Sequence, residues 1–237
     1  MADAALTPEC RTLSAVLCRR LLMSDFDEAF SPLSDEIKAA VKQQLLVAIV
    51  NESVDLMRRK IADVAAELVR EHFDDDGVCQ WPEFQPFIFE CFKSENPGLR
   101  EIACHLFASV PAVFGPDNTA NMPHIAHMLN QALSDQSLKV RIAGFRALCA
   151  FLVHNSTETS VQHALKDLAQ PALMAVAMSV EAEPDDDTML KCLVELADAA
   201  SKYLRPFLPH TLDLCYKASF LNLPFSIPPP PESLATS

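Results

Sequence analysis

The sequence contains little glycine, and this scarcity limits the folds that the chain can adopt. Only 4 of its 237 residues are glycine, whereas 50% are hydrophobic. Sheet proteins need many tight turns, which glycine favours, so an all-β fold is disfavoured. Packed helices that are joined by short turns fit this composition better, and we expect an all-α protein.

The sequence also lacks long apolar segments and closely spaced cysteine pairs. No apolar run reaches the roughly 20 residues that a membrane span requires, so we expect no membrane insertion. The start, Met1–Arg11, has no signal-peptide h-region. Eight cysteines are present without a C-x-x-C pair, and five of them lie within apolar helical patterns, at positions 18, 91, 104, 149 and 192. Buried thiols in a reducing compartment explain this pattern, and we expect a protein of the cytoplasm and nucleus.

Motifs that carry catalysis or cofactor binding are missing as well. The sequence contains no G-x-S-x-G, no Gly-rich phosphate loop and no H-E-x-x-H. Solitary serines and histidines do not form a catalytic arrangement. We therefore expect that the protein is not an enzyme and needs no cofactor.

Positive charge is scarce relative to negative charge. The chain has 19 Lys and Arg residues against 32 Asp and Glu residues, which gives a net charge of −13. Such a chain repels nucleic acid and anionic lipid, so neither is expected as the main partner. Basic protein segments are the natural partners of an acidic surface.

A repeated spacing runs through the sequence. A helix-capping residue is followed four positions later by a basic residue, and the basic residues are 41, 41 and 50 positions apart. Apolar or small residues follow at two, three and six positions beyond each basic residue, which places them on one stripe of a helix. Helical repeats of about 40 to 47 residues are typical of HEAT or armadillo solenoids. The four pairs are Asp55/Arg59, Asn96/Arg100, Ser137/Arg141 and Asp187/Lys191.

The repeats divide the chain into one solenoid of antiparallel helix pairs, residues 1–218, and a proline-rich tail, 219–237, that we expect to be disordered. Within the pattern, Ile61, Ala65, Ile102, Leu106 and Leu193 are predicted to be buried, and Pro171 to kink a helix. The expected elements are an unpaired helix at 8–30, pairs at about 35–72, 82–110, 122–154 and 159–201, and an unpaired helix at 202–218.

Two segments resemble metal sites but lack parts of them. Residues 72–83 match an EF-hand loop at Asp74, Asp76 and Gly77 and end in a glutamate, but the first ligand position is His72. We interpret this segment as an acidic turn. His124 and His127 share one face of a helix, but no nearby residue completes a zinc site. We predict no metal.

The second helices of the pairs carry polar residues that could contact a partner. Lys60, Asp63, Glu67 and Arg70 lie on one face, although an ordinary solvated face would show the same pattern. The possible continuations on later second helices are Glu101, His105, Arg146 and Glu195. The basic column of Arg59, Arg100, Arg141 and Lys191 has two interpretations. A ladder of hydrogen bonds between repeats is favoured over a stripe for cargo, because the column recurs at the same register.

Several stretches resemble the amino-terminal HEAT repeats of beta-type importins, also called karyopherins. They are residues 13–22 (LSAVLCRRLL), 57–68 (MRRKIADVAAEL), 75–82 (DDGVCQWP), 98–103 (GLREIA) and 190–206 (LKCLVELADAASKYLRP). The resemblance implies a nuclear import receptor, or a truncated part of one, that binds protein cargo with basic import signals and the GTP-bound small GTPase Ran on its concave face. Nucleoporins are further possible partners. The alternative is a HEAT-repeat scaffold or adaptor in another complex, such as a phosphatase or vesicle coat.

Overall fold

The computed structural model describes residues 7–114, 121–183 and 186–221. Within these residues the chain is helical and forms no strand; Phe73 and Cys79 alone make an isolated antiparallel bridge. The all-α prediction is confirmed. No helix in the described part of the chain is both long enough and apolar enough to cross a membrane.

The helices form four antiparallel pairs with one unpaired helix at each end. Helix α1 (Pro8–Ser24) precedes the pairs, and α13 (Leu208–Leu221) follows them. The first helices of the pairs are α3 (Asp35–Asn51), α5 (Phe84–Phe92), α7 (Met122–Leu133) and α10 (Ala169–Ala182). The second helices are α4 (Asp55–Arg70), α6 (Pro97–Ser109), α8 (Leu138–His154) and α11 (Thr188–Ala199). Short turns of helix connect them: α2 (Phe26–Ala29), η1 (Pro111–Phe114), α9 (Thr159–Ala164), η2 (Lys166–Leu168), α12 (Ser201–Leu204) and η3 (Arg205–Phe207).

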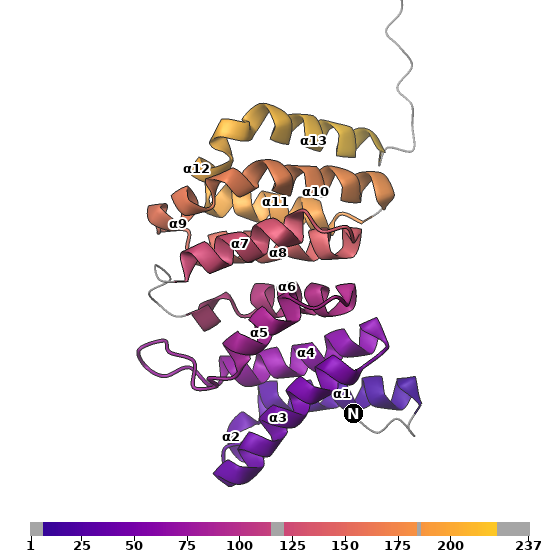
Figure 1. The fold of residues 1–237 in the computed structure, drawn as a ribbon, viewed down its shortest axis with the longest axis vertical. Coiled ribbons are helices and arrows are strands. Elements are labelled where there is room, and N and C mark those ends of the chain that lie inside the picture. Colours follow the sequence, from indigo (N-terminus) through magenta and orange to yellow (C-terminus); the bar gives the residue numbers. More distant parts are fainter. Residues whose placement is uncertain (1–6, 115–120, 184–185, 222–237) are drawn as a thin grey trace, which may run out of the picture.

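The pairs stack into a solenoid of two layers (Figure 1). Helices α4, α6, α8 and α11 contact one another in turn and form the second-helix layer, and α1 extends this layer by packing against α4. Helix α13 packs on α10 in the other layer. Each pair buries its apolar side only by stacking on its neighbours, as HEAT solenoids do.

The local signals that begin these helices are visible in the sequence. Thr7 and Asn96 cap α1 and α6, accepting hydrogen bonds from the backbone N–H groups of Cys10 (3.4 Å) and Gly98 (2.8 Å). The expected caps at Asp55, Asp187 and Ser137 are wrong. Asp55 is the first residue of α4 rather than its cap, and the side chains of Asp187 and Ser137 make no cap hydrogen bond. Asp135 instead accepts a hydrogen bond from the Ser137 N–H at 2.8 Å. This hydrogen bond shapes the turn that precedes α8 and does not cap the helix itself.

Burial follows the repeated pattern closely. The five residues that the pattern places in the core, Ile61, Ala65, Ile102, Leu106 and Leu193, are at most 2% exposed, so this prediction is confirmed. Burial within α3 increases along the helix, since Ile37 near its start is 50% exposed whereas Leu45 and Ile49 further along are buried.

Two helices expected to be continuous are broken. The expected helix at 159–182 consists of α9, η2 and α10, so the break precedes Pro171 rather than occurring at it. Pro171 lies in the first turn of α10, where a proline has no helical N–H to lose. The expected helix at 8–30 is likewise divided at Asp25 into α1 and α2. Helix α13 is described as far as Leu221, three residues beyond the expected helix end at 218, and the proline-rich segment 222–237 lies outside the described residues.

The cysteines are free thiols in the structure. Cys91, Cys104 and Cys149 are buried, while Cys18 and Cys192 are half-buried. Burial raises the pKa of the Cys91 thiol to about 12, which keeps it protonated and unreactive at neutral pH. These residues act as small apolar side chains in the core.

Candidate partner-binding face

The polar residues that the sequence places on second helices come together between repeats. Asp63 on α4 contacts His105 on α6, with 2.8 Å between Oδ1 and Nε2, and Lys60 lies 3.4 Å from its other oxygen. Burial raises the pKa of Asp63, but the hydrogen bond and the charges of His105 and Lys60 outweigh this effect and lower it. Asp63 and His105 therefore form a half-buried link between two repeats.

Glu67 connects α4 with α1 directly and with the end of α6 through Arg70. It accepts hydrogen bonds from Arg19 on α1 (2.8 Å to Nε) and pairs with Arg70 on α4 (2.6 Å to Nη1). Arg70 also donates to the Ser109 carbonyl at the end of α6 at 2.8 Å. Burial opposes ionisation of Glu67, yet hydrogen bonds with the two arginines dominate and lower its pKa. Only 8% of Glu67 is exposed, so its carboxylate is occupied inside the chain.

Glu101 is in the same situation. It is 4% exposed and pairs with Arg59 of the preceding repeat. Neither Glu67 nor Glu101 offers a free carboxylate to a partner. Of the eight candidate residues, Arg146 on α8, Glu195 on α11 and Arg70 at the edge of α4 are exposed, and Arg70 is already paired with Glu67.

Two of the four residues of the basic column, Arg59 and Arg100, connect repeats. Arg100 forms two hydrogen bonds with the Asp135 carboxylate, 2.6 Å from Nε and 2.9 Å from Nη2, and this raises its pKa. Arg141 donates to the Asp135 backbone carbonyl at 2.9 Å. Lys191 differs, since it pairs only with Asp187 of its own helix at 2.8 Å and is exposed. The ladder interpretation is confirmed for Arg59 and Arg100.

Two important polar residues were missed by the sequence reasoning. Arg58 is 4% exposed and donates to the Ile49 carbonyl (3.2 Å) and to Asp55 (2.8 Å), which joins α4 to the end of α3. Asp135 joins Arg100, Arg141 and Ser137 in one turn. The position of Asp135 two residues before Ser137, the residue that precedes α8, is a signal that could have identified it.

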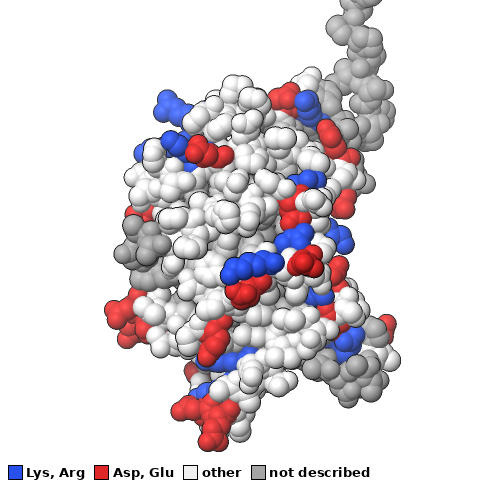
Figure 2. All heavy atoms as spheres, viewed as in Figure 1, with Lys and Arg blue, Asp and Glu red and all other residues white. Residues whose placement is uncertain are grey.

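Charge is unevenly distributed over the surface. Helix α8 contains Lys139, Arg141 and Arg146 and no acidic residue, whereas α11 contains Glu195 and Asp198 with one lysine. Figure 2 shows the first-helix side of the molecule, where large uncharged areas lie between clusters of charged groups. The net charge of −13 therefore does not mark the whole second-helix layer as acidic.

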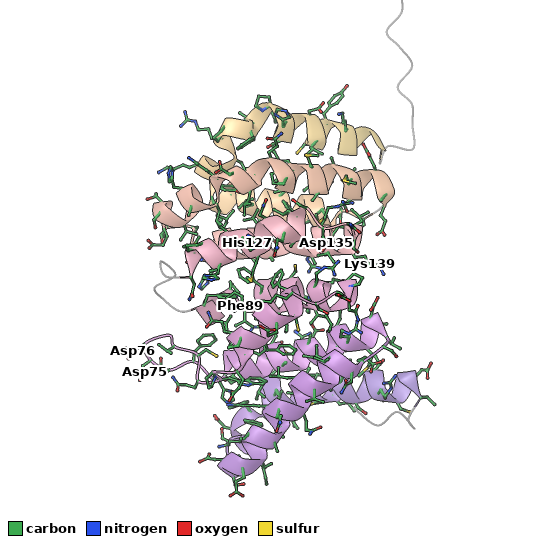
Figure 3. The ribbon with its side chains drawn as sticks, in the orientation of Figure 1. Asp75, Asp76, Phe89, His127, Asp135 and Lys139 are labelled. Atoms are coloured by element: carbon green, nitrogen blue, oxygen red, sulfur yellow. The ribbon has the colours of Figure 1, made fainter. Side chains whose placement is uncertain are left out.

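The acidic segment that resembles an EF-hand forms a self-contained turn. Asp74 accepts hydrogen bonds from the backbone N–H groups of Asp76 (3.1 Å) and Val78 (2.7 Å) and from the Gln80 side chain (2.7 Å). Gly77 has a positive φ of 75°, which an L-residue rarely adopts. Asp75 and Asp76 project from the side of the helical stack (Figure 3). The carboxylate of Asp74 is used to shape the turn.

The histidine pair of α7 lies on the outer surface. His124 and His127 are exposed, and the His124 ring contacts Phe89 of α5 with centroids 6.4 Å apart. Figure 3 shows Phe89 and His127 on neighbouring first helices. Across the ranges that the structure describes, no three His, Cys, Asp or Glu residues gather as they would around a metal ion.

Comparison with known proteins relates this architecture to importins. The family model described as "IPO5-like, TPR repeats" matches residues 53–214. Importin subunit beta-3 of Saccharomyces cerevisiae is 24% identical over 204 residues, which are 81% of this chain and 18% of that protein. The chain thus spans about a fifth of the length of this curated relative.

Solved structures of Kap121p share the fold. The crystal structure of Kap121p superposes with a TM-score of 0.71 at 24% identity, covering 93% of this chain and 21% of that chain. Kap121p bound to Pho4p gives a TM-score of 0.71 at 25% identity, with 94% and 21% covered. Kap121p bound to Nup53p gives 0.67 at 24%, with 88% and 19% covered. With its HEAT-type repeat spacing and the family model matching more than half of its length, the chain belongs to the importin family of the IPO5-like type.

Proposed function

We propose that this chain works as a nuclear import receptor, or as part of one, that holds protein cargo and GTP-bound Ran on its second-helix layer. Membership of the importin family is the observation that carries this proposal. Shuttling between cytoplasm and nucleus and contact with nucleoporins follow from the same role. The solved relatives are bound to Pho4p and to Nup53p, which supports proteins as the class of partner.

The charge pattern refines which part of this layer meets which partner. Arg146 is exposed on α8, a helix without acidic residues, and suits an acidic protein surface. Glu195 and Asp198 are exposed on α11 and suit a basic import signal. Lys60, Asp63 and Arg70 on α4 and His105 on α6 lie in the two pairs that precede α8, where they can add contacts at the edge of a bound segment.

Binding assays with Ran and a basic peptide test this proposal. We expect the chain to bind GTP-loaded Ran more tightly than GDP-loaded Ran, and to bind a basic import peptide with an affinity that falls as salt rises. Reversing Glu195 and Asp198 together to Lys should weaken peptide binding about tenfold, which corresponds to about 1.4 kcal/mol. Reversing the exposed Glu90 on α5 is the matched control and should change nothing.

The same assays can reject the proposal. If folded protein binds neither form of Ran nor the peptide at tens of micromolar, the chain is not a transport receptor. Reversal of Glu67, in contrast, tests stability rather than binding, because this carboxylate is buried and paired with Arg19 and Arg70. Circular dichroism on each variant separates the two effects.

A further inference from the structure

A groove of about 510 Å³ lies between α3 and the turn that leads into α5. Lys38 and Lys42 of α3 line one side of it, and Trp81 and Glu83 line the other. The groove separates the first helix pair from the second, so its position does not depend on where the chain begins or ends. Its helix α3 is a first helix, which makes the groove separate from the second-helix layer that we propose for Ran and cargo.

The two lysines differ from the other cationic residues because no carboxylate contacts them. Both are half-buried, yet neither forms an ion pair or a hydrogen bond within the part of the chain that the structure describes. The other half-buried or buried lysines and arginines of this part each bind a carboxylate or a backbone carbonyl. They are Arg11, Arg19, Arg58, Lys60, Arg100 and Arg141. Two positive charges in the groove are therefore left for a ligand.

The charge of Lys42 has an aromatic ring beside it. Its Nζ lies over the Trp81 ring, 5.7 Å from the centroid, which is near the outer limit of a cation–π contact. Burial lowers the pKa of Lys42. Lys38 lowers this pKa further, while Cys79 and Glu83 act in the opposite direction. An anion placed between the two lysines would offset their repulsion and stabilise both charged forms.

We propose that this groove binds an extended acidic segment of a partner protein, with acidic residues at alternate positions facing Lys38 and Lys42. The two lysines are four residues apart on α3, which spaces them by about 6 Å along the helix. In an extended segment, side chains two residues apart point the same way and are separated by about 7 Å. Acidic residues at every second position therefore match the two lysines, whereas adjacent acidic residues point in opposite directions.

The margins of the groove limit the length of the acidic stretch. Asp35 lines it one turn before Lys38, and Glu83 lines the other wall. Both carboxylates belong to exposed residues and repel further acidic residues of a partner. We therefore expect two acidic residues in the bound stretch rather than a long run. Leu46 and Pro82 also line the groove and offer apolar contacts beside these residues.

The single tryptophan of the chain reports on this groove. Because the Lys42 ammonium lies over the Trp81 ring, moving that ammonium toward a peptide carboxylate should change the tryptophan emission. Titration with the peptide Ser-Glu-Ser-Glu-Ser should show this change with a dissociation constant of about 1 mM. The isomeric peptide Ser-Ser-Glu-Glu-Ser has the same charge but adjacent glutamates, and should bind about threefold or more weakly.

Charge-removing variants test which lysines are responsible. Lys38→Gln and Lys42→Gln together should weaken binding of the alternating peptide about tenfold or more. The matched control, Lys93→Gln with Lys139→Gln, removes the same charge from exposed lysines that already pair with carboxylates, and should change affinity little. Lys42→Arg keeps the charge and should retain most of the binding. Fluorescence anisotropy of a labelled peptide measures all of these variants, because Lys42→Gln removes the charge next to the tryptophan.

Several results would overturn the proposal. One is an alternating peptide that changes neither the emission nor the anisotropy at several millimolar. Equal binding of the isomeric peptide, or an equal loss in the control variant, would show unspecific attraction and would also contradict it. Displacement of the peptide by inorganic phosphate at equal concentration would assign the groove to a free anion instead of a protein segment.

Two further measurements separate this site from other effects. Circular dichroism shows whether each variant is folded, and Lys42→Arg separates loss of charge from loss of the side chain. Binding of Ran and of a basic import peptide should be unchanged in every variant, because α3 is not part of the second-helix layer. Failure of the groove proposal is thus distinguishable from failure of the proposed function.

Discussion

Charged contacts hold the repeats together in the first part of the second-helix layer, and apolar contacts do so near its end. Between α1 and α8, side chains about one repeat apart form ion pairs: Arg11–Glu52, Arg19–Glu67, Arg59–Glu101 and Arg100–Asp135. In the described residues from α11 onward, the ion pairs Asp187–Lys191 and Asp213–Lys217 each join two exposed side chains four residues apart and link no repeats.

This difference shows that the same helical repeat can be stabilised in two ways. Half-buried, hydrogen-bonded ion pairs such as Arg100–Asp135 fix how far one repeat can slide on the next. Exposed pairs within one helix contribute little. Beyond α8, stability depends on buried residues such as Leu193 and Leu196 and on the Tyr203 hydroxyl, which donates to the Leu165 carbonyl at 2.9 Å. We expect the last repeat to open before the first ones.

The largest effect should come from a charge in the core of the first part. Leu106 is fully buried in α6, and Leu106→Asp should lower the free energy of unfolding by about 4 kcal/mol or more, because the carboxylate finds no partner there. Leu212→Asp, at a position that is 58% exposed in α13, should change it by less than about 0.5 kcal/mol. Urea unfolding followed by circular dichroism measures both. Equal losses would show that α13 is covered in solution.

Removing one ion pair should lower the free energy of unfolding by less than a charge in the core does, and by more in the first part of the layer than near its end. Arg100→Ala removes two hydrogen bonds to Asp135 and two to backbone carbonyls, and should cost about 2 kcal/mol. Lys191→Ala removes an exposed pair within one helix and should cost at most about 0.5 kcal/mol. Urea unfolding compares the two variants, because a shift of the midpoint at an unchanged m-value reports a change in the free energy of unfolding. Similar values for the two variants would remove the distinction between the regions.

Low pH should reduce the free energy of unfolding, because it protonates the carboxylates that link the repeats between α1 and α8. Folding lowers the pKa values of Asp63, Glu67 and Asp135, so their contribution is complete above the ordinary carboxylate range of about pH 4 and is lost as pH falls below it. The free energy of unfolding should therefore decline from about pH 5 downward. The double variant Asp63→Asn, Glu67→Gln should show a shallower decline. An identical pH profile for the variant would mean that these pairs do not contribute.

The smallest effect on stability is expected from calcium. The Asp74 carboxylate already accepts hydrogen bonds within its own turn, so millimolar Ca²⁺ should leave the melting temperature unchanged. Thermal melting with and without calcium, with Asp75→Asn as the comparison variant, checks this expectation. A rise that disappears in the variant would establish a cation site in the acidic turn.

The repeat architecture was accessible from sequence because its determinants are local. Caps such as Thr7 and Asn96, followed by apolar residues at helical spacing, predict where helices begin and which face they bury. The burial of Ile61, Leu106 and Leu193 follows from this pattern. The kink expected at Pro171 was misplaced, because this proline lies in the first turn of α10, where no helical N–H is lost, and the chain turns earlier, at the buried Leu165.

The polar residues of the second helices could not be assigned from the sequence. Glu67 and Glu101 have the helical spacing of a solvated face, yet both are buried and paired with arginines of another helix. Spacing along one helix cannot reveal a partner about 40 residues away, because that contact depends on how the repeats stack. The same holds for Leu13 and Leu17, which have the pattern of core residues and remain exposed.

The sequence by itself determined the helical class, the register of the repeats and the membership of the importin family, because short-range caps, periodicity and recognisable stretches encode them. Only the tertiary structure decided which charges are free, since a carboxylate such as Glu67 becomes unavailable when a neighbouring repeat supplies Arg19. It also decided that the end helices expose core-type faces, because burial depends on a neighbouring helix and is not a property of α1 or α13 alone.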